Sequence, residues 1–158
     1  MIQNNDSFYG IDNLDKDILS ILMKDGRTPY TEIGKKLFCS AATVHVRMKK
    51  LERLGVVKKQ QLIINYKAIG YDIAAFLGIF LTSSSMYEKV ANELNKIPEM
   101  VGLHYTTGAY SMFAKIICRD TDHLMEVLHS KIQCVTGIQR TETLISLKEN
   151  LDRPLKIS

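Results

Sequence analysis

The sequence has few of the features that mark secreted or metal-binding proteins. It contains three cysteines in 158 residues, Cys39, Cys118 and Cys134, and they form no Cys-x-x-Cys pair. An odd number of widely separated cysteines argues against a disulfide framework and favours free thiols in a reducing compartment. The four histidines form no pair at i,i+3 or i,i+4 spacing, so we expect neither a metal site nor a bound cofactor.

Long apolar runs are also absent. The longest run, over residues 73–81, is about half the length that a membrane-spanning helix needs. Residues 1–10 are polar and lack the apolar segment of a secretory signal. We therefore expect a flexible leader at 1–10 and a cytoplasmic protein that has no membrane partner.

Catalytic motifs are missing as well. The sequence has no Gly-rich phosphate loop, no Cys/His or Ser/His pair at a useful spacing, and no paired carboxylates on one strand face. Glu142 is the only acid in a suggestive position, and we interpret it as a surface residue. The sequence therefore argues against an enzyme.

Positive charge is concentrated in the N-terminal part of the chain. Residues 1–70 contain 12 Lys and Arg against 7 Asp and Glu, whereas residues 71–158 contain 9 against 10. The segment 35–59 alone carries eight basic residues and one acid, Glu52. Such a block indicates a module that binds a polyanion, joined to a module with another role. Charge alone is equally consistent with a solvated helix face.

Apolar residues at helical spacing predict three short helices in this basic part. The expected N-caps are Asp12 or Asn13 for the first helix, Thr28 for the second and Ser40 for the third. A tight turn between the second and third helices then predicts a helix-turn-helix over about residues 30–49.

The spacing inside this motif fits close packing of its two helices. Gly34 puts a small residue where the third helix approaches the second, and Val44 follows ten positions later. The outward face of the third helix, which we expect to include Lys50, starts with small residues suited to base edges and continues with basic residues suited to phosphates. A helical protein-interaction domain is the alternative. The predicted DNA-binding residues are Ser40, Ala41, Ala42, Thr43, His45, Arg47, Lys49 and Lys50.

The C-terminal half has a different pattern. After an extended segment over 56–65, which we interpret as a wing or connecting strand, strands are expected over 73–81, 101–107, 112–118 and 138–147. Helices are expected after a capping box at 85–88 and over 120–132. The order strand, helix, strand, strand, helix, strand predicts a ferredoxin-like βαββαβ domain, which makes the whole chain α+β. Because helices cover only one face of such a sheet, we expect a second subunit's sheet on the other face.

The domain organisation that we predict has five parts. They are a leader (1–10), a helix-turn-helix DNA-binding domain (11–65), a linker (66–72), a ferredoxin-like effector-binding and oligomerisation domain (73–150) and a tail (151–158).

This organisation resembles the Lrp/AsnC (feast/famine) family of bacterial and archaeal transcription regulators over most of the chain. The residues that carry the resemblance are 11–15, 27–28, 40–51, 54–57, 107–111 and 142–147. Residues 43–47, 105–108 and 132–133 are more similar to the asparagine-responsive regulators of the family than to the leucine-responsive ones. Phe38 departs from the family, which usually has glycine in that turn; a left-handed backbone there would cost about 1 kcal/mol or more.

The resemblance implies how such a protein works. A small amino acid, with asparagine as the first choice, would bind the C-terminal (RAM) domain between dimers, and homodimers would assemble into octamers or other higher forms on double-stranded DNA. Hydroxyl groups around Gly108 suit the ammonium, carboxylate and amide of such a ligand, although ordinary β-propensity also explains them. The predicted effector-binding residues are Thr106, Thr107, Gly108, Tyr110, Ser111, Thr141 and Thr143.

The predicted function is therefore a sequence-specific transcription regulator of amino-acid metabolism that responds to asparagine. Two alternatives stay open, namely the same type of regulator with another amino-acid effector, and an architectural DNA-binding protein without a ligand.

Overall fold

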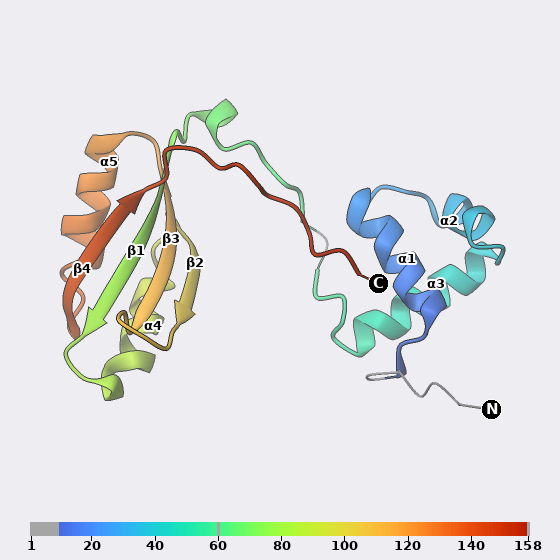
Figure 1. The fold of residues 1–158 in the computed structure, drawn as a ribbon, viewed down its shortest axis with the longest axis horizontal. Helices are drawn as coiled ribbons and strands as arrows, with labels where there is room; N and C mark the ends of the chain where they lie inside the picture. Colours follow the sequence, from blue (N-terminus) through green and yellow to red (C-terminus); the bar gives the residue numbers. More distant parts are fainter. Residues whose placement is uncertain (1–9, 60, 158) are drawn as a thin grey trace. The chain divides into compact units, whose positions relative to one another are not determined.

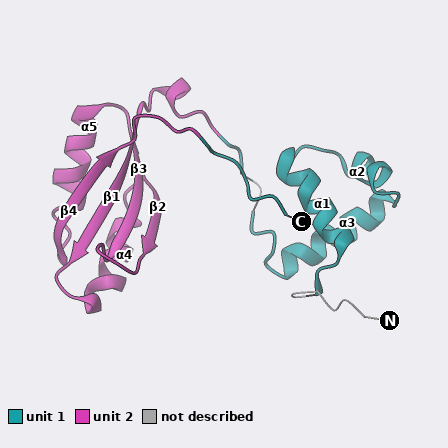
Figure 2. Cartoon of the chain, in the orientation of Figure 1, with its two compact units in different colours: residues 1–63, 151–158 teal, residues 64–150 magenta. Residues whose placement is uncertain are grey.

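The computed structural model describes residues 10–59 and 61–157 and divides the chain into two compact units (Figures 1 and 2). One unit runs up to Ile63 and includes the segment from Leu151 onward, and the other is Ile64–Asn150. Apart from Gly10, the predicted leader lies outside the described residues. Among the residues described, no helix has both the length and the apolar character to cross a membrane.

The first unit contains a three-helix domain, as predicted. Its helices are α1 (Asn13–Lys24), α2 (Tyr30–Lys36) and α3 (Ala41–Arg53). Apolar residues at helical spacing bring one face of each helix into a common core, which makes burial of this face the main source of stability. The buried core residues are Ile18, Ile33, Val44, Met48 and Leu51.

A side-chain hydrogen bond caps the N-terminus of α3 but not that of α2. The Ser40 hydroxyl accepts a hydrogen bond of 3.0 Å from the Thr43 backbone N–H, which confirms Ser40 as the N-cap of α3. The prediction that Thr28 caps α2 is wrong. The Thr28 hydroxyl instead donates to the Asp25 carbonyl at 2.9 Å, and α2 begins after Pro29 without a side-chain cap.

The turn between α2 and α3 packs closely against Gly34 of α2, and it carries backbone strain at Phe38. A Cβ atom on Gly34 would lie 2.6 Å from the Cys39 carbonyl oxygen, so the predicted need for a small residue is confirmed. Phe38 has a left-handed backbone with a φ of 54°, and its side chain is 97% exposed. Because burial does not offset the strain, Phe38 costs this unit about 1 kcal/mol.

We expect Phe38→Gly to raise the free energy of unfolding of this unit by about 0.5–1 kcal/mol, because glycine adopts a positive φ without a steric penalty. Urea denaturation of the full chain, followed by circular dichroism, would measure the change. Phe38→Ala is the control, since alanine keeps the Cβ atom that causes the strain. Equal stability of the two variants would contradict the assignment of strain to this residue.

The second unit is a four-stranded antiparallel sheet with the strand order β2-β3-β1-β4, and helices cover one of its faces (Figure 1). The predicted ferredoxin-like arrangement is confirmed. In the centre of the sheet, Leu77 of β1 lies opposite Ala114 of β3 and Thr143 of β4. The elements are β1 (Ile73–Leu81), α4 (Tyr87–Leu94), β2 (Met100–Tyr105), β3 (Met112–Cys118), α5 (Thr121–Glu126) and β4 (Ile138–Ile145).

Several boundaries in this unit differ from the sequence prediction. The capping box at 85–88 does not form, because Ser83 is the residue whose hydroxyl accepts from the Ser85 backbone N–H (3.3 Å), at the start of a 3₁₀ turn, η3 (Ser84–Met86). The last strand ends at Ile145 instead of residue 147. The segment 56–65, most of which belongs to the first unit, was expected to be extended, and it forms no strand within its described residues.

The helix predicted over 120–132 begins as expected but changes its geometry. After α5 it continues as a π-helix, η4 (Val127–Ile132), which ends with a hydrogen bond of 2.8 Å from the Gln133 N–H to the Leu128 carbonyl. Hydrogen bonds of the i→i+5 type bring residues five apart onto nearby faces. Val127 and Ile132 therefore both reach the core of the unit.

The three cysteines are free, and their environments differ. Cys39 is half-buried in the turn before α3, Cys118 is buried at the end of β3, and Cys134 is exposed just after η4. Burial raises the pKa of the Cys118 thiol above its ordinary value.

Candidate DNA-binding surface and effector site

The third helix of the first unit presents one face to solvent. Ala42, His45, Val46 and Lys49 are exposed, and the ring of His45 lies 6.2 Å from the ring of Tyr30 on α2. At the start of α3, the predicted DNA-binding residue Ser40 is exposed, and Ala41 and Thr43 are half-buried. Small, hydrogen-bonding and basic side chains on one helix face can contact both base edges and phosphates.

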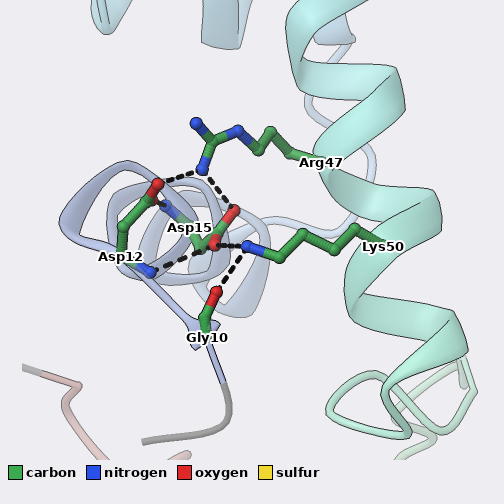
Figure 3. Close-up of polar contacts among 5 residues, drawn as sticks. All are labelled: Gly10, Asp12, Asp15, Arg47 and Lys50. Atoms are coloured by element: carbon green, nitrogen blue, oxygen red, sulfur yellow. Dashed lines mark hydrogen bonds and ion pairs between the residues drawn. The ribbon is translucent and has the colours of Figure 1, made fainter. Parts of the chain in front are cut away.

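The two remaining predicted residues, Arg47 and Lys50, point toward α1 (Figure 3). Arg47 Nη1 donates to Asp15 Oδ1 at 3.1 Å and also pairs with Asp12. Lys50 Nζ lies 2.6 Å from Asp15 Oδ2 and 2.6 Å from the carbonyl oxygen of Gly10. The expectation that Lys50 belongs to the outward face is therefore wrong, because a buried carboxylate on α1 attracts its ammonium group.

The carboxylates that hold Arg47 and Lys50 also form the capping box of α1. The Asp15 N–H donates to Asp12 Oδ1 at 2.9 Å, and the Asp12 N–H donates to Asp15 Oδ2 at 3.1 Å. Asp15 is fully buried. The hydrogen bond from Arg47 holds the pKa of Asp12 below its ordinary value, and the same bond raises the pKa of Arg47. Both charges of this pair are therefore present at neutral pH.

Sequence reasoning considered Asp12 only as a candidate N-cap and identified no partner for Asp15. The pattern that could have indicated more is the matched spacing, since two acids three residues apart open α1 and two cations three residues apart, Arg47 and Lys50, lie on α3. Residues three apart share one side of a helix. Two such pairs of opposite charge can therefore face each other.

The predicted effector residues of the hairpin between β2 and β3 have structural roles of their own. The Thr106 hydroxyl donates to the Tyr110 carbonyl at 2.7 Å, and the Ser111 hydroxyl accepts from a backbone N–H of β1 at 3.3 Å. Thr107 and Gly108 are exposed. The φ of Gly108 is +117°, and a Cβ atom there would have no neighbour within 4 Å. This position therefore requires glycine because of its backbone conformation, not because a side chain would lack space.

Tyr110 lies across the outer face of the sheet, which we define as the face that α4 and α5 leave uncovered. A Cβ atom on Gly78 would overlap the Tyr110 ring, and the Tyr110 hydroxyl donates to Glu142 Oε2 at 2.8 Å. Arg140 pairs with Glu142 and lies 3.6 Å from the ring centre of Phe80. Glu142 raises the pKa of Tyr110, and Arg140 lowers that of Glu142. Glu142 is thus a partner of Tyr110 and not merely a surface residue.

Thr141 and Thr143 lie on the opposite side of β4. They pair with Ile79 and Leu77, whose side chains are in the core, and directly paired residues share a face. The Thr141 hydroxyl accepts a hydrogen bond of 3.4 Å from Gln133. Within one subunit, the seven predicted effector residues therefore do not converge on one point.

A cavity of about 290 Å³ opens elsewhere on the second unit. Its acid, Glu99, is about nine-tenths buried, and Glu99 Oε1 lies 2.7 Å from Lys131 Nζ and 3.2 Å from His123 Nε2. None of the predicted effector residues lines this cavity, so it is not the site that the sequence predicts. The lining residues are Tyr66, Ile69, Tyr71, Pro98, Glu99, Val101 and Ile117. Across the described residues, no cluster of His, Cys, Asp and Glu could hold a metal ion.

A helix-turn-helix joined to a ferredoxin-like domain defines a class of ligand-responsive transcription regulators. Residues 11–52 match the AsnC-type helix-turn-helix domain, and residues 74–155 match the Lrp/AsnC ligand binding domain. The sequence is 43% identical to the regulatory protein AsnC of Haemophilus influenzae and 41% identical to that of Escherichia coli, over 94% of this chain and 99% and 97% of those proteins. The chain belongs to the Lrp/AsnC family.

Solved structures agree with this assignment. The structure of E. coli AsnC superimposes with a TM-score of 0.89 at 41% identity, over 94% of this chain and 99% of that chain. A transcriptional regulator of Neisseria meningitidis, solved as a complex with L-Met, has the same fold, with a TM-score of 0.85 at 21% identity over 90% and 94% of the two chains. Since its relatives are named as regulators, the protein is a DNA-binding transcription regulator and not an enzyme.

Proposed function

We propose that the protein is a sequence-specific regulator of amino-acid metabolism whose DNA binding or assembly responds to a small amino acid. The observation that carries the proposal is the match of residues 74–155 to the Lrp/AsnC ligand binding domain. Asparagine is the first candidate, because residues 105–108 and 132–133 are similar to the asparagine-responsive regulators. The L-Met bound to the related N. meningitidis regulator supports another amino acid as the alternative. A regulator of this kind acts in the compartment that contains the DNA, which supports a cytoplasmic location.

We assign DNA contact to the exposed face of α3. Ser40, Ala42, His45 and Lys49 are exposed there, and Ala41 and Thr43 begin the helix beside them. Lys49 is the basic residue of this set and would contact a phosphate, whereas His45 can hydrogen-bond a base edge. DNA binding should therefore weaken with salt, because each neutralised phosphate contributes about −0.9 to the log–log slope.

We expect Lys49→Ala to weaken binding to all duplexes alike and to flatten the salt slope by about one unit. The measurement is fluorescence anisotropy at several salt concentrations, with a duplex selected by the full protein from a random pool. His45→Ala is the matched variant and should change the preferred sequence without flattening the slope. A slope that Lys49→Ala leaves unchanged would contradict the proposed DNA-binding face.

A thermal melt with each of the twenty amino acids tests the effector. A ligand that binds only the folded protein raises the melting temperature by linkage. A rise with asparagine supports the proposal, and a rise with a different amino acid replaces asparagine but keeps the ligand-responsive function. If no amino acid raised the melting temperature, the result would overturn the ligand-responsive function in favour of an architectural DNA-binding protein.

We expect Gly108→Val to abolish the amino-acid response while the fold and DNA binding are retained. The φ of +117° is one that a β-branched residue does not adopt, so the exposed hairpin must change shape. Isothermal titration with the amino acid found in the melts would measure the loss of heat. Ala109→Val, the next residue of the same turn, is the control and should bind normally. Equal heats for both variants would exclude the hairpin as the site.

We further propose a homodimer formed through the outer face of the sheet, assembling into octamers or related forms with the effector between dimers. In one subunit this face carries the rings of Phe76 and Phe113, stacked with 5.8 Å between centroids, beside Phe80 and the exposed Leu144. An apolar face of this kind favours a partner. A second copy of the chain, related to the first by two-fold symmetry, would cover this apolar face.

A further inference from the structure

The rotation of α3 about its own axis decides which of its side chains face DNA. Successive residues are about 100° apart around an α-helix, so a modest rotation would replace one contact residue by another. The buried residues Val44, Met48 and Leu51 attract α3 to the core without directional preference. Ion-paired hydrogen bonds do have a direction.

The directional contacts of α3 with α1 come from Arg47 and Lys50. Asp15 Oδ1 accepts from Arg47 and Asp15 Oδ2 lies beside Lys50, so a single carboxylate contacts two cations that are three residues apart on α3. Asp12 adds a second contact to Arg47 (Figure 3). Since Asp15 is also fixed by the capping box, these contacts tie α3 to the first turn of α1 in one orientation.

The same contacts change the charge that α3 offers to DNA. Two carboxylates balance two cations, and the side chains of Arg47 and Lys50 are each only 28% exposed. Non-specific DNA binding depends on cations that replace the counterions of phosphates. Cations held by Asp15 do not contribute to it, whereas Lys49 remains exposed.

We propose that Asp15, supported by Asp12, is a positioning residue for DNA recognition. It fixes the rotation of α3 and withholds Arg47 and Lys50 from the phosphate backbone, which favours the selected site over other DNA. The inference rests on the proposed DNA-binding face.

Asp15→Asn in the full-length protein tests this role, because asparagine keeps the size of the side chain and removes its charge. We expect a several-fold higher affinity for a random-sequence duplex at low salt and a log–log slope steeper by about one unit for each released cation. The ratio between the affinities for the selected and random duplexes should fall. Asp17→Asn is the matched control, because Asp17 is an exposed acid on the same helix, and it should leave slope and ratio unchanged.

A second substitution identifies the released cation. In the Asp15→Asn background, Lys50→Met should remove about one unit of the gained slope. If circular dichroism shows that Asp15→Asn does not fold, Asp12→Asn takes its place with Arg47→Met as the second substitution, because the Asp12 side chain is 49% exposed and pairs with Arg47.

The outcomes separate this inference from the proposed function. A folded variant whose salt slope and affinity ratio equal those of the wild type would overturn the positioning role. So would a variant that binds both duplexes more weakly with the salt slope of the wild type. A wild-type protein that binds neither duplex would instead overturn the proposed DNA-binding face.

Discussion

Gly34→Ala is expected to lower the free energy of unfolding of the three-helix domain by about 1–3 kcal/mol, in the range of other overpacked sites. The added Cβ atom would lie 2.6 Å from the Cys39 carbonyl oxygen and 3.2 Å from the Ala41 nitrogen. Both are backbone atoms, so the clash can be relieved only if the start of α3 moves. Such a loss is a large part of the stability of a small domain and should weaken DNA binding.

Urea denaturation with circular dichroism, combined with the anisotropy assay, measures both effects of Gly34→Ala. Gly26→Ala is the matched control, because its nearest contact would be an ordinary 3.6 Å to the Leu22 carbonyl oxygen. Equal stability of the two alanine variants would show that the turn between α2 and α3 yields more easily than its geometry indicates.

Leu144→Glu is expected to prevent the proposed dimer from forming and to leave a monomer. Leu144 is 52% exposed on the outer face of a single subunit, so glutamate there should leave the fold intact. In a two-fold interface the substitution occurs twice and buries a carboxylate each time, at a cost of several kcal/mol unless the charge is paired. A loss of about 4 kcal/mol in the free energy of association raises the dissociation constant of a dimer about a thousandfold.

Light scattering of the full-length protein at micromolar concentration gives the mass of each variant. Met125→Glu serves as the control, because Met125 is 55% exposed on α5, in the layer that covers the other face of the sheet. If Leu144→Glu retained the mass of the wild-type assembly, the outer face would not be the dimer interface.

The types of the elements could be predicted from the sequence because apolar spacing differs between helices and strands. Val44, Met48 and Leu51 follow helical spacing and are buried, whereas Leu54, which continues the same spacing, is 43% exposed. Helix starts were less predictable where several hydroxyl residues adjoin, since nothing in the pattern of Ser83, Ser84 and Ser85 selects the one that caps. The π-helix was missed because Leu124, Leu128 and Ile132 recur every four residues, the spacing of an ordinary helix, so the pattern does not reveal the wider turn.

The side-chain contacts of the candidate sites could be predicted only in part, because they depend on residues far apart in the chain. Lys49 and Lys50 are neighbours in sequence, yet one faces solvent and the other contacts a carboxylate 35 positions earlier. Tyr110 and Glu142, 32 residues apart, meet across the sheet only because Gly78 lacks a side chain. An isolated glycine inside an apolar strand indicates such a close approach.

The different environments of the three thiols make the chain suited to selective labelling. Cys118, buried and with a raised pKa, should resist alkylating dyes until the sheet opens, whereas Cys134 is accessible. Cys39 lies two residues before α3, so a dye attached there would be sensitive to bound DNA. Dyes on Cys39 and Cys134 lie in different units. Labels on these two thiols would therefore report on the two units separately.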